Sequence, residues 1–122
     1  MIAIVCGGRD YANEARLRTV MDAAVTRRGL DTIIEGEATG ADTLARQWAE
    51  ARGDIGIIAV AADWGGQGAS AGPRRNKLML DILVGGDDRR RARCVIAFPG
   101  GRGTGNMVLQ ARGAGVEVFE VK

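Results

Sequence analysis

Five short apolar segments alternate with four helical patterns along the 122-residue chain, and this alternation constrains the fold more than any other feature. The apolar segments are rich in Ile and Val and span residues 2–6, 32–35, 55–61, 94–98 and 116–121. The first, third and fourth segments show no regular polar alternation, which is typical of strands that are buried on both faces of a parallel sheet. Strands that alternate with helices predict such a sheet, because each helix carries the chain back across one of its faces.

The helical patterns place apolar side chains on one face of residues 13–28, 41–52, 73–84 and 103–114. Asn13 is suited to cap the first helix, Gly29 to end it, and Pro73 to open the third. We therefore predict a single α/β domain over residues 1–122, a Rossmann-like three-layer sandwich whose five-stranded parallel sheet carries helices on both faces. The charged residues 87–93 are predicted to form a solvated loop.

Composition limits the partners that this chain can have. A formal net charge of +2 does not require a nucleic-acid partner. The chain has no His and only two cysteines, Cys6 and Cys94, which we expect to be free, buried thiols, so we predict neither a metal site nor a cofactor. No apolar stretch is long enough to cross a bilayer, so we expect a cytoplasmic protein that has no membrane partner.

In open parallel sheets ligands bind beyond the carboxyl ends of the strands, where the strand order reverses. Glycine-rich segments follow the first two predicted strands. After the first strand the candidate binding residues are Gly7, Gly8, Arg9 and Asp10. After the second they are Thr39, Gly40 and Asp42. The spacing of Thr39 and Asp42 predicts a capping box, whose helix start would also offer free N–H groups to an anion.

The third and fourth strands are followed by two further candidate segments. Residues 62–76 form a glycine-rich loop long enough to close over a ligand, and in it we single out Trp64, Arg75 and Asn76. We place Arg75 in the first turn of the third helix, where a cation is locally unfavourable and so indicates an anionic partner. The last segment predicts a phosphate cradle at the start of the fourth helix, formed by Pro99, Gly100, Gly101, Gly103 and Thr104. It lacks the Gly-Lys-Ser/Thr ending of a P-loop.

Several of these motifs together resemble the SLOG superfamily, and within it the YspA-like (cpYpsA-related) branch found in bacteria and their phages. The resemblance spans essentially the whole chain, and more distant relatives are the LOG-type phosphoribohydrolases and the DprA-like proteins. It rests on Gly7-Gly8-Arg9-Asp10-Tyr11, Gly40-Ala41-Asp42, Ala62-Asp63-Trp64, Ala71-Gly72-Pro73-x-Arg75-Asn76 and Pro99-Gly100-Gly101-x-Gly103-Thr104.

The resemblance implies a Rossmann-like fold that binds nucleotides or nucleotide-derived signals. In LOG-type enzymes an Arg that corresponds to Arg75 binds phosphate, and the Pro-Gly-Gly motif ends in a Glu needed to cleave the N-glycosidic bond. That Glu corresponds to Met107, which cannot transfer a proton. Hydrolysis would then need another acid, and the candidate catalytic residues are Asp10, Asp42 and Asp63. LOG-type relatives form dimers, so we expect a homodimer or a higher homo-oligomer.

Three functions follow, in order of preference. The first is binding of a nucleotide or of an ADP-ribose-like ligand at the carboxyl-terminal edge of the sheet, by a sensor, carrier or sequestering module. The second is hydrolysis of nucleoside 5′-monophosphates, as in the LOG-type enzymes. The third is binding of single-stranded nucleic acid, as in the DprA-like proteins, which only the Arg content favours.

Overall fold

The computed structural model describes residues 1–86 and 91–122, so most of the loop predicted at residues 87–93 lies outside the described residues. Strands and helices alternate in the predicted order. In chain order the elements are β1 (Ile2–Cys6), α1 (Glu14–Arg28), β2 (Thr32–Glu35), α2 (Ala41–Arg52), β3 (Gly56–Ala59), α3 (Trp64–Gln67), a 3₁₀ turn (Gly68–Ser70), α4 (Ala71–Val84), β4 (Arg93–Ala97), α5 (Arg102–Gly113) and β5 (Glu117–Glu120).

The five strands form one parallel sheet in the order β3-β2-β1-β4-β5. This arrangement confirms the predicted α/β fold. The strand order reverses between β1 and β4, which pair from Ile2 opposite Arg93 to Cys6 opposite Ala97. Both strands are central and buried, as their apolar sequences predicted. The same prediction is wrong for β3, which lies at the edge of the sheet with Gly56 and Ala59 exposed.

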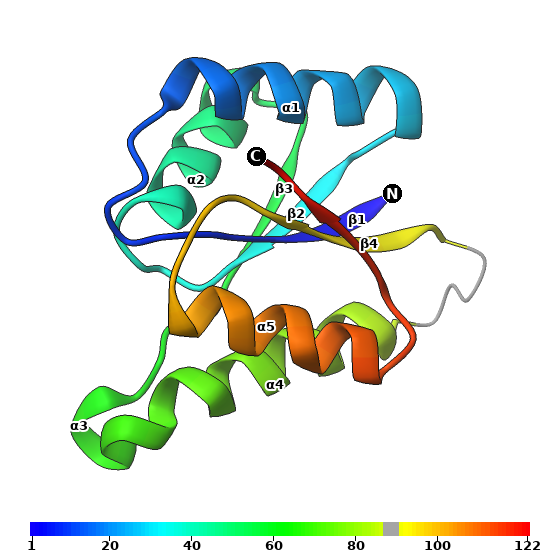
Figure 1. Cartoon of the computed structure of the whole chain (residues 1–122). Coiled ribbons are helices and arrows are strands. Elements are labelled where there is room, and N and C mark those ends of the chain that lie inside the picture. The colour runs from blue at the N-terminus through cyan, green and yellow to red at the C-terminus, as the bar shows by residue number, and fades with distance from the viewer. Residues whose placement is uncertain (87–90) are drawn as a thin grey trace.

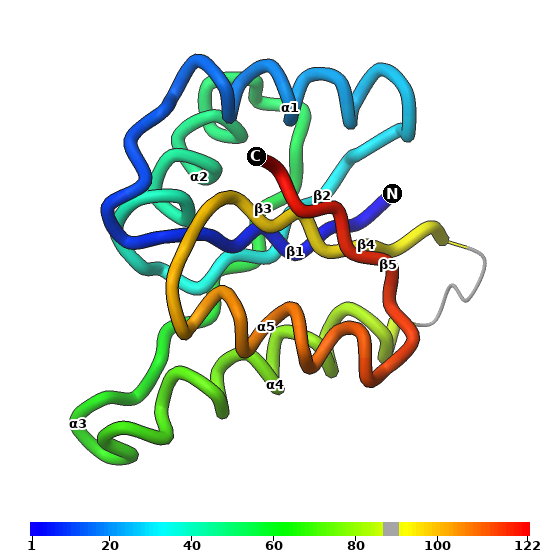
Figure 2. Tube along the Cα trace, in the orientation of Figure 1, coloured from blue at the N-terminus to red at the C-terminus, as the bar shows by residue number. Residues whose placement is uncertain are grey.

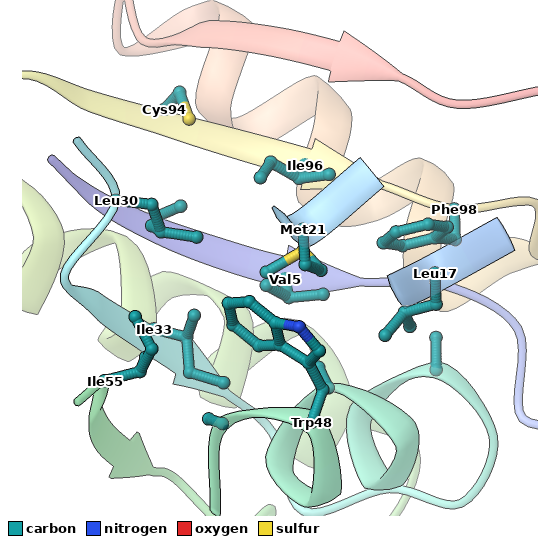
Figure 3. Close-up of a cluster of buried hydrophobic side chains, with 14 of the residues drawn as sticks. Val5, Leu17, Met21, Leu30, Ile33, Trp48, Ile55, Cys94, Ile96 and Phe98 are labelled. Atoms are coloured by element: carbon teal, nitrogen blue, oxygen red, sulfur yellow. The ribbon is translucent and has the colours of Figure 1, made fainter. Parts of the chain in front are cut away.

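Helices α1 and α2 cover one face of the sheet, and α4 and α5 cover the other (Figure 1). Successive residues of β1 and β4 point to opposite faces, so each strand contributes to two hydrophobic clusters. Figure 3 shows the first cluster, in which Leu17, Met21 and Trp48 pack on Val5 and Ile96. The second cluster joins the other face to α4 and α5, and its most buried members include Ile4, Met79, Leu83, Val95 and Met107.

The ends of α1 lie where the sequence predicted them. The Asn13 side chain accepts a hydrogen bond from the Arg16 N–H at 3.0 Å, and Gly29 ends the helix in the left-handed conformation with φ 68°. The predicted start of α4 at Pro73 is wrong, because the helix begins two residues earlier, at Ala71. Proline is tolerated throughout the first turn, where backbone N–H groups have no helical partner, so it does not mark the first residue.

The glycine-rich residues 62–76 contain structure that we did not predict. Asp63 accepts a hydrogen bond from the Gly66 N–H at 3.0 Å and caps the short helix α3. The two glycines of α3 have low helix propensity, which hid this helix in the sequence. Figure 2 shows that α3 lies at the end of the molecule where the chain leaves β1 and β4.

Of the helices formed by residues 1–86 and 91–122, none combines the length and the apolar character needed to cross a lipid bilayer.

Cys6 and Cys94 are free and buried, as predicted, and burial raises the pKa of Cys6 to about 12 and that of Cys94 to about 11. Because the thiolate is the reactive form, we expect neither thiol to react with a disulfide reagent in the native protein at mildly alkaline pH. Both should react after unfolding in guanidinium chloride. The measurement is the time course of thiol labelling, and rapid labelling of the native protein would contradict this account.

Candidate functional site

The turn after β1 touches both the turn before α2 and the turn after β4 through backbone atoms. The Gly8 N–H donates to the Pro99 carbonyl at 2.8 Å, and the Ala41 N–H donates to the Gly8 carbonyl at 3.1 Å. The Thr39 hydroxyl adds a third bond, to the Arg9 carbonyl, at 3.1 Å. Three of the four segments that the sequence singled out therefore form one continuous surface.

Glycine is required where these turns approach each other most closely. A Cβ atom on Gly8 would lie 2.9 Å from the Pro99 carbonyl oxygen. Gly40 has a φ of +73°, and a Cβ there would lie 2.5 Å from the Arg9 carbonyl oxygen. Gly101 and Gly103 differ, because nothing lies within 4 Å of a Cβ placed on either. The first pair thus holds the turns together, whereas the second pair leaves the backbone open to a ligand.

A pocket of about 850 Å³ lies beyond the carboxyl ends of β1 and β4, at the reversal of strand order. Most of the predicted binding residues line it. They are Gly7, Gly8, Arg9, Asp10, Asp42, Trp64, Arg75, Asn76, Pro99, Gly100, Gly101, Gly103 and Thr104.

The remaining predicted residues lie elsewhere. Thr39 lines a smaller adjoining pocket of about 290 Å³, and Gly40 is enclosed between turns. Asp63 is exposed and caps α3, so it does not line either pocket. The sequence analysis did not select two residues of α5 that also line the larger pocket, Arg102 and Asn106. Their position at the start of this helix, beside the predicted phosphate cradle, could have identified them as binding residues.

The capping box predicted for Thr39 and Asp42 is wrong. Gly40 is the N-cap of α2, and no side chain caps the helix. Asp42 turns back into the loop, where its Oδ2 atom accepts hydrogen bonds from the N–H groups of Gly36 at 3.1 Å and Ala38 at 3.2 Å. Because Gly40 and not Thr39 is the N-cap, Asp42 is the second residue of α2 and not the third that a capping box requires, and its side chain supports the preceding loop.

Arg75 is fixed in place by two hydrogen bonds. Its Nη1 donates to the Gly36 carbonyl at 2.5 Å, and its Nε donates to the Asn76 Oδ1 atom at 3.0 Å. The Asn76 Nδ2 in turn donates to the Gly103 carbonyl and to Asn106, each at 3.1 Å. Since α4 begins at Ala71, both residues lie in its second turn and not in the first as predicted. Asn76 thereby joins the guanidinium to the start of α5.

Among the described residues that line the larger pocket, positive charges outnumber negative ones. Arg9, Arg75 and Arg102 line it together with two carboxylates, those of Asp10 and Asp42. Within residues 1–86 and 91–122, none of these three arginines has a carboxylate oxygen within 4.0 Å. The first N–H groups of α5 also face this end of the sheet without a side-chain cap. The arrangement is suited to hold an anion.

Two buried acidic groups, Asp42 on the pocket wall and Glu35, have raised pKa values. Burial raises the pKa of Asp42, although its two backbone hydrogen bonds and the Arg75 guanidinium oppose that shift. Burial also raises the pKa of Glu35, a fully buried residue at the end of β2. Its Oε2 accepts the Glu37 N–H at 2.6 Å and so holds a residue whose φ is +55°. Its Oε1 is buried and has no hydrogen-bond partner among the described residues.

Met107, which the sequence resemblance aligns with the acid of the LOG-type enzymes, points away from the pocket. Its side chain is fully buried among the apolar residues between the sheet, α4 and α5. The carboxylates that do line the pocket are those of Asp10 and Asp42.

The fold and the pocket together define a Rossmann-like α/β protein with an arginine-lined pocket at the strand-order reversal. Residues 1–66 match the YspA, cpYpsA-related SLOG family, more than half of the chain, and the chain belongs to this family. A search of curated proteins finds no match. Membership of the SLOG family indicates a nucleotide-related ligand. The matched region covers the turns after β1 and β2 and ends within α3, before Arg75 and the turn after β4.

We predict that Gly40→Ala destabilises the fold more than Gly53→Ala does. Both glycines have positive φ, 73° and 77°, so both substitutions strain the backbone, and at Gly53, which has the left-handed helical conformation, this strain costs about 1–2 kcal/mol. Only Gly40 also faces backbone atoms of another turn, which adds about 1–3 kcal/mol of steric strain. Guanidinium chloride unfolding measures the difference, and equal losses would contradict the close packing of the turns.

The raised pKa of Glu35 predicts how stability depends on pH. A carboxyl whose pKa is higher in the folded state stabilises the fold at low pH, and this contribution is lost as the pH rises through the folded value. We therefore expect wild type to lose more unfolding free energy than Glu35→Gln between about pH 4 and about pH 8. Glu50→Gln, on the exposed side of α2, controls for removal of one negative charge. Parallel pH profiles for all three proteins would contradict the assignment.

Proposed function

We propose that this protein binds a nucleotide or a nucleotide-derived ligand, such as an ADP-ribose-like molecule, and holds its phosphate at the carboxyl-terminal edge of the sheet. In this role it acts as a sensor, a carrier or a sequestering module. The observation that carries the proposal is the convergence of three arginines without carboxylate partners, among the described residues, on one pocket beside an uncapped helix start.

The phosphate subsite that we propose lies between Arg75 and the first turn of α5. The open space above Gly101 and Gly103 allows an anion to approach the backbone N–H groups of residues 102–104. Thr104 lines the same pocket and brings a hydroxyl donor. Arg75 donates one N–H to the Gly36 carbonyl and one to the Asn76 side chain. Its other N–H groups therefore remain available for phosphate.

The size of the pocket favours a ligand larger than free phosphate. Its volume of about 850 Å³ lies in the upper part of the range of roughly 300–1,000 Å³ that is usual for small-molecule sites. The smaller pocket of about 290 Å³ shares Arg9, Trp64 and Arg75 with it and extends the available space. A phosphate bound at the start of α5 therefore leaves room for a sugar and a base.

Binding without hydrolysis is the better-supported activity. Met107 is buried in the core, where an acid aligned with the LOG-type enzymes would stand. Asp42 reaches the pocket, but its Oδ2 already accepts two backbone N–H groups. We expect no free base when AMP or CMP is incubated with the protein. Release of base at a rate abolished by Asp42→Asn would overturn this part of the proposal.

The proposal predicts that Arg75→Ala weakens nucleotide binding, measured by titration calorimetry with AMP and ADP-ribose, by about tenfold to a hundredfold. A charge-assisted hydrogen bond contributes about 1.5–3 kcal/mol, which corresponds to this range. Arg74→Ala is the matched control, because Arg74 is exposed on the same helix and does not line either pocket. Thr104→Val removes the hydroxyl with little change of shape and should also weaken binding.

Two outcomes would contradict the proposal. One is the absence of binding, and of any thermal stabilisation, with every nucleotide tested at millimolar concentration, since a ligand that binds only the folded state must stabilise it. The other is an equal loss of affinity in Arg74→Ala and Arg75→Ala, which would place the phosphate outside the pocket.

A further inference from the structure

Trp64 is an exposed aromatic side chain within the proposed binding region. Its side chain is 48% exposed, whereas Trp48, the other tryptophan of the chain, is 8% exposed and packs in the core. Trp64 lines both the larger pocket and the smaller one, so it forms part of the boundary between them. Its place on the wall of both pockets leaves the indole ring open to contact with a ligand bound there.

The Trp64 ring is held by contacts on its edge and on its face. Gly72 in α4 leaves room for the edge of the indole, because a Cβ atom there would lie 3.1 Å from the Cη2 atom of Trp64. The Arg9 guanidinium lies over the ring, with its Cζ atom 5.1 Å from the ring centroid. Among the described residues no carboxylate oxygen lies within 4.0 Å of the Arg9 guanidinium, and its contact with the indole is a cation–π contact.

A nucleobase is chemically suited to take the place of this guanidinium. Both are planar, and both stack on an indole ring. Stacking of a base on an aromatic side chain contributes more to binding than an exposed cation–π contact does. An Arg9 side chain released from Trp64 stays in the larger pocket. There it can bind the same phosphate group that Arg75 and the start of α5 bind in the function we propose. The exchange therefore replaces a weak contact by a stack and a charge-assisted hydrogen bond.

We propose that Trp64 is the stacking platform for the base of the bound nucleotide, and that Arg9 leaves the indole ring and binds the ligand's phosphate. This inference rests on the proposed function, and it narrows the ligand to one that carries both an aromatic base and a phosphate. Trp64 acts on the base alone, whereas Arg9, Arg75 and Thr104 act on the phosphate.

The experiment compares probes with and without a base. The affinities of AMP, GMP, CMP and UMP are measured against ribose 5-phosphate by calorimetry, for wild type, Trp64→Ala, Trp64→Phe and Arg9→Ala. For wild type we expect at least one nucleotide to bind about fivefold to a hundredfold more tightly than ribose 5-phosphate. Trp64→Ala should abolish this preference without weakening the binding of ribose 5-phosphate, and Trp64→Phe should keep part of the preference.

Arg9→Ala should have the complementary effect. It should weaken nucleotides and ribose 5-phosphate together and leave the preference for a base intact. Fluorescence provides a second readout, because Trp64 is the one tryptophan left in a Trp48→Phe variant. Its emission should be quenched by the nucleotides and not by ribose 5-phosphate. The affinity ratios decide the question by themselves if that core variant does not fold.

The outcomes separate the inference from the function on which it rests. If neither these probes nor ADP-ribose bind wild type, the proposed function fails, and the stacking inference fails with it. If nucleotides and ribose 5-phosphate bind wild type equally well, or if Trp64→Ala keeps the preference for a base, the stacking inference is overturned. The proposed phosphate site then stands.

Discussion

The pocket depends on backbone contacts between turns that are far apart in the sequence. The turn after β1 bonds to the turn after β4 through Gly8 and Pro99, and to the start of α2 through Gly8 and Ala41. These approaches leave no room for a Cβ atom at Gly8 or Gly40. Because β1 and β4 are neighbours and α2 packs on β1, the sheet order sets this meeting point. The side chains of Arg9, Arg75 and Arg102 line the pocket at this point.

The electrostatics of the site depend on which charged side chains already bind other parts of the protein. Asp42 accepts hydrogen bonds from two backbone N–H groups of the loop after β2, and Glu35 accepts one from the Glu37 N–H group. These buried acids thus stabilise the shape of the loop. Arg75 is oriented by an uncharged carbonyl and an uncharged amide, and no carboxylate oxygen of the described residues lies within 4.0 Å of its guanidinium. A site built in this way is organised for an anion before the ligand arrives.

Much of the fold could be predicted from the sequence, because local patterns determine it. The sequence predicted both residues that cap α1, Asn13 and Gly29. It also predicted the order of the five strands and the four longer helices. Two of the errors came where a local pattern had two structural solutions. Thr39 and Asp42 have the spacing of a capping box, but Gly40 and not Thr39 is the N-cap of the helix. Pro73 fits several positions of a first turn, so it misplaced the start of α4.

The candidate site was predictable in its turns but not in its connections. Glycines and arginines after the strands pointed to the pocket, since parallel strands end at one edge. The bridge from Arg75 through Asn76 to Gly103 depends on how α4 packs against α5, which no local pattern contains. The same holds for Arg9 over Trp64, two residues from different turns. Asn106 was missed because its role appears only when the two helices are side by side.

The most direct test of the central claim is an NMR titration of the ¹⁵N-labelled protein with AMP or ADP-ribose. The claim is that the backbone N–H groups at the start of α5, after β4, receive the phosphate. The predicted result is a saturable shift of the amide resonances of Arg102, Gly103 and Thr104. A titration that leaves these amides unchanged, or that shifts only residues of the groove between α1 and α2 such as Leu44 and Gln47, would contradict the account.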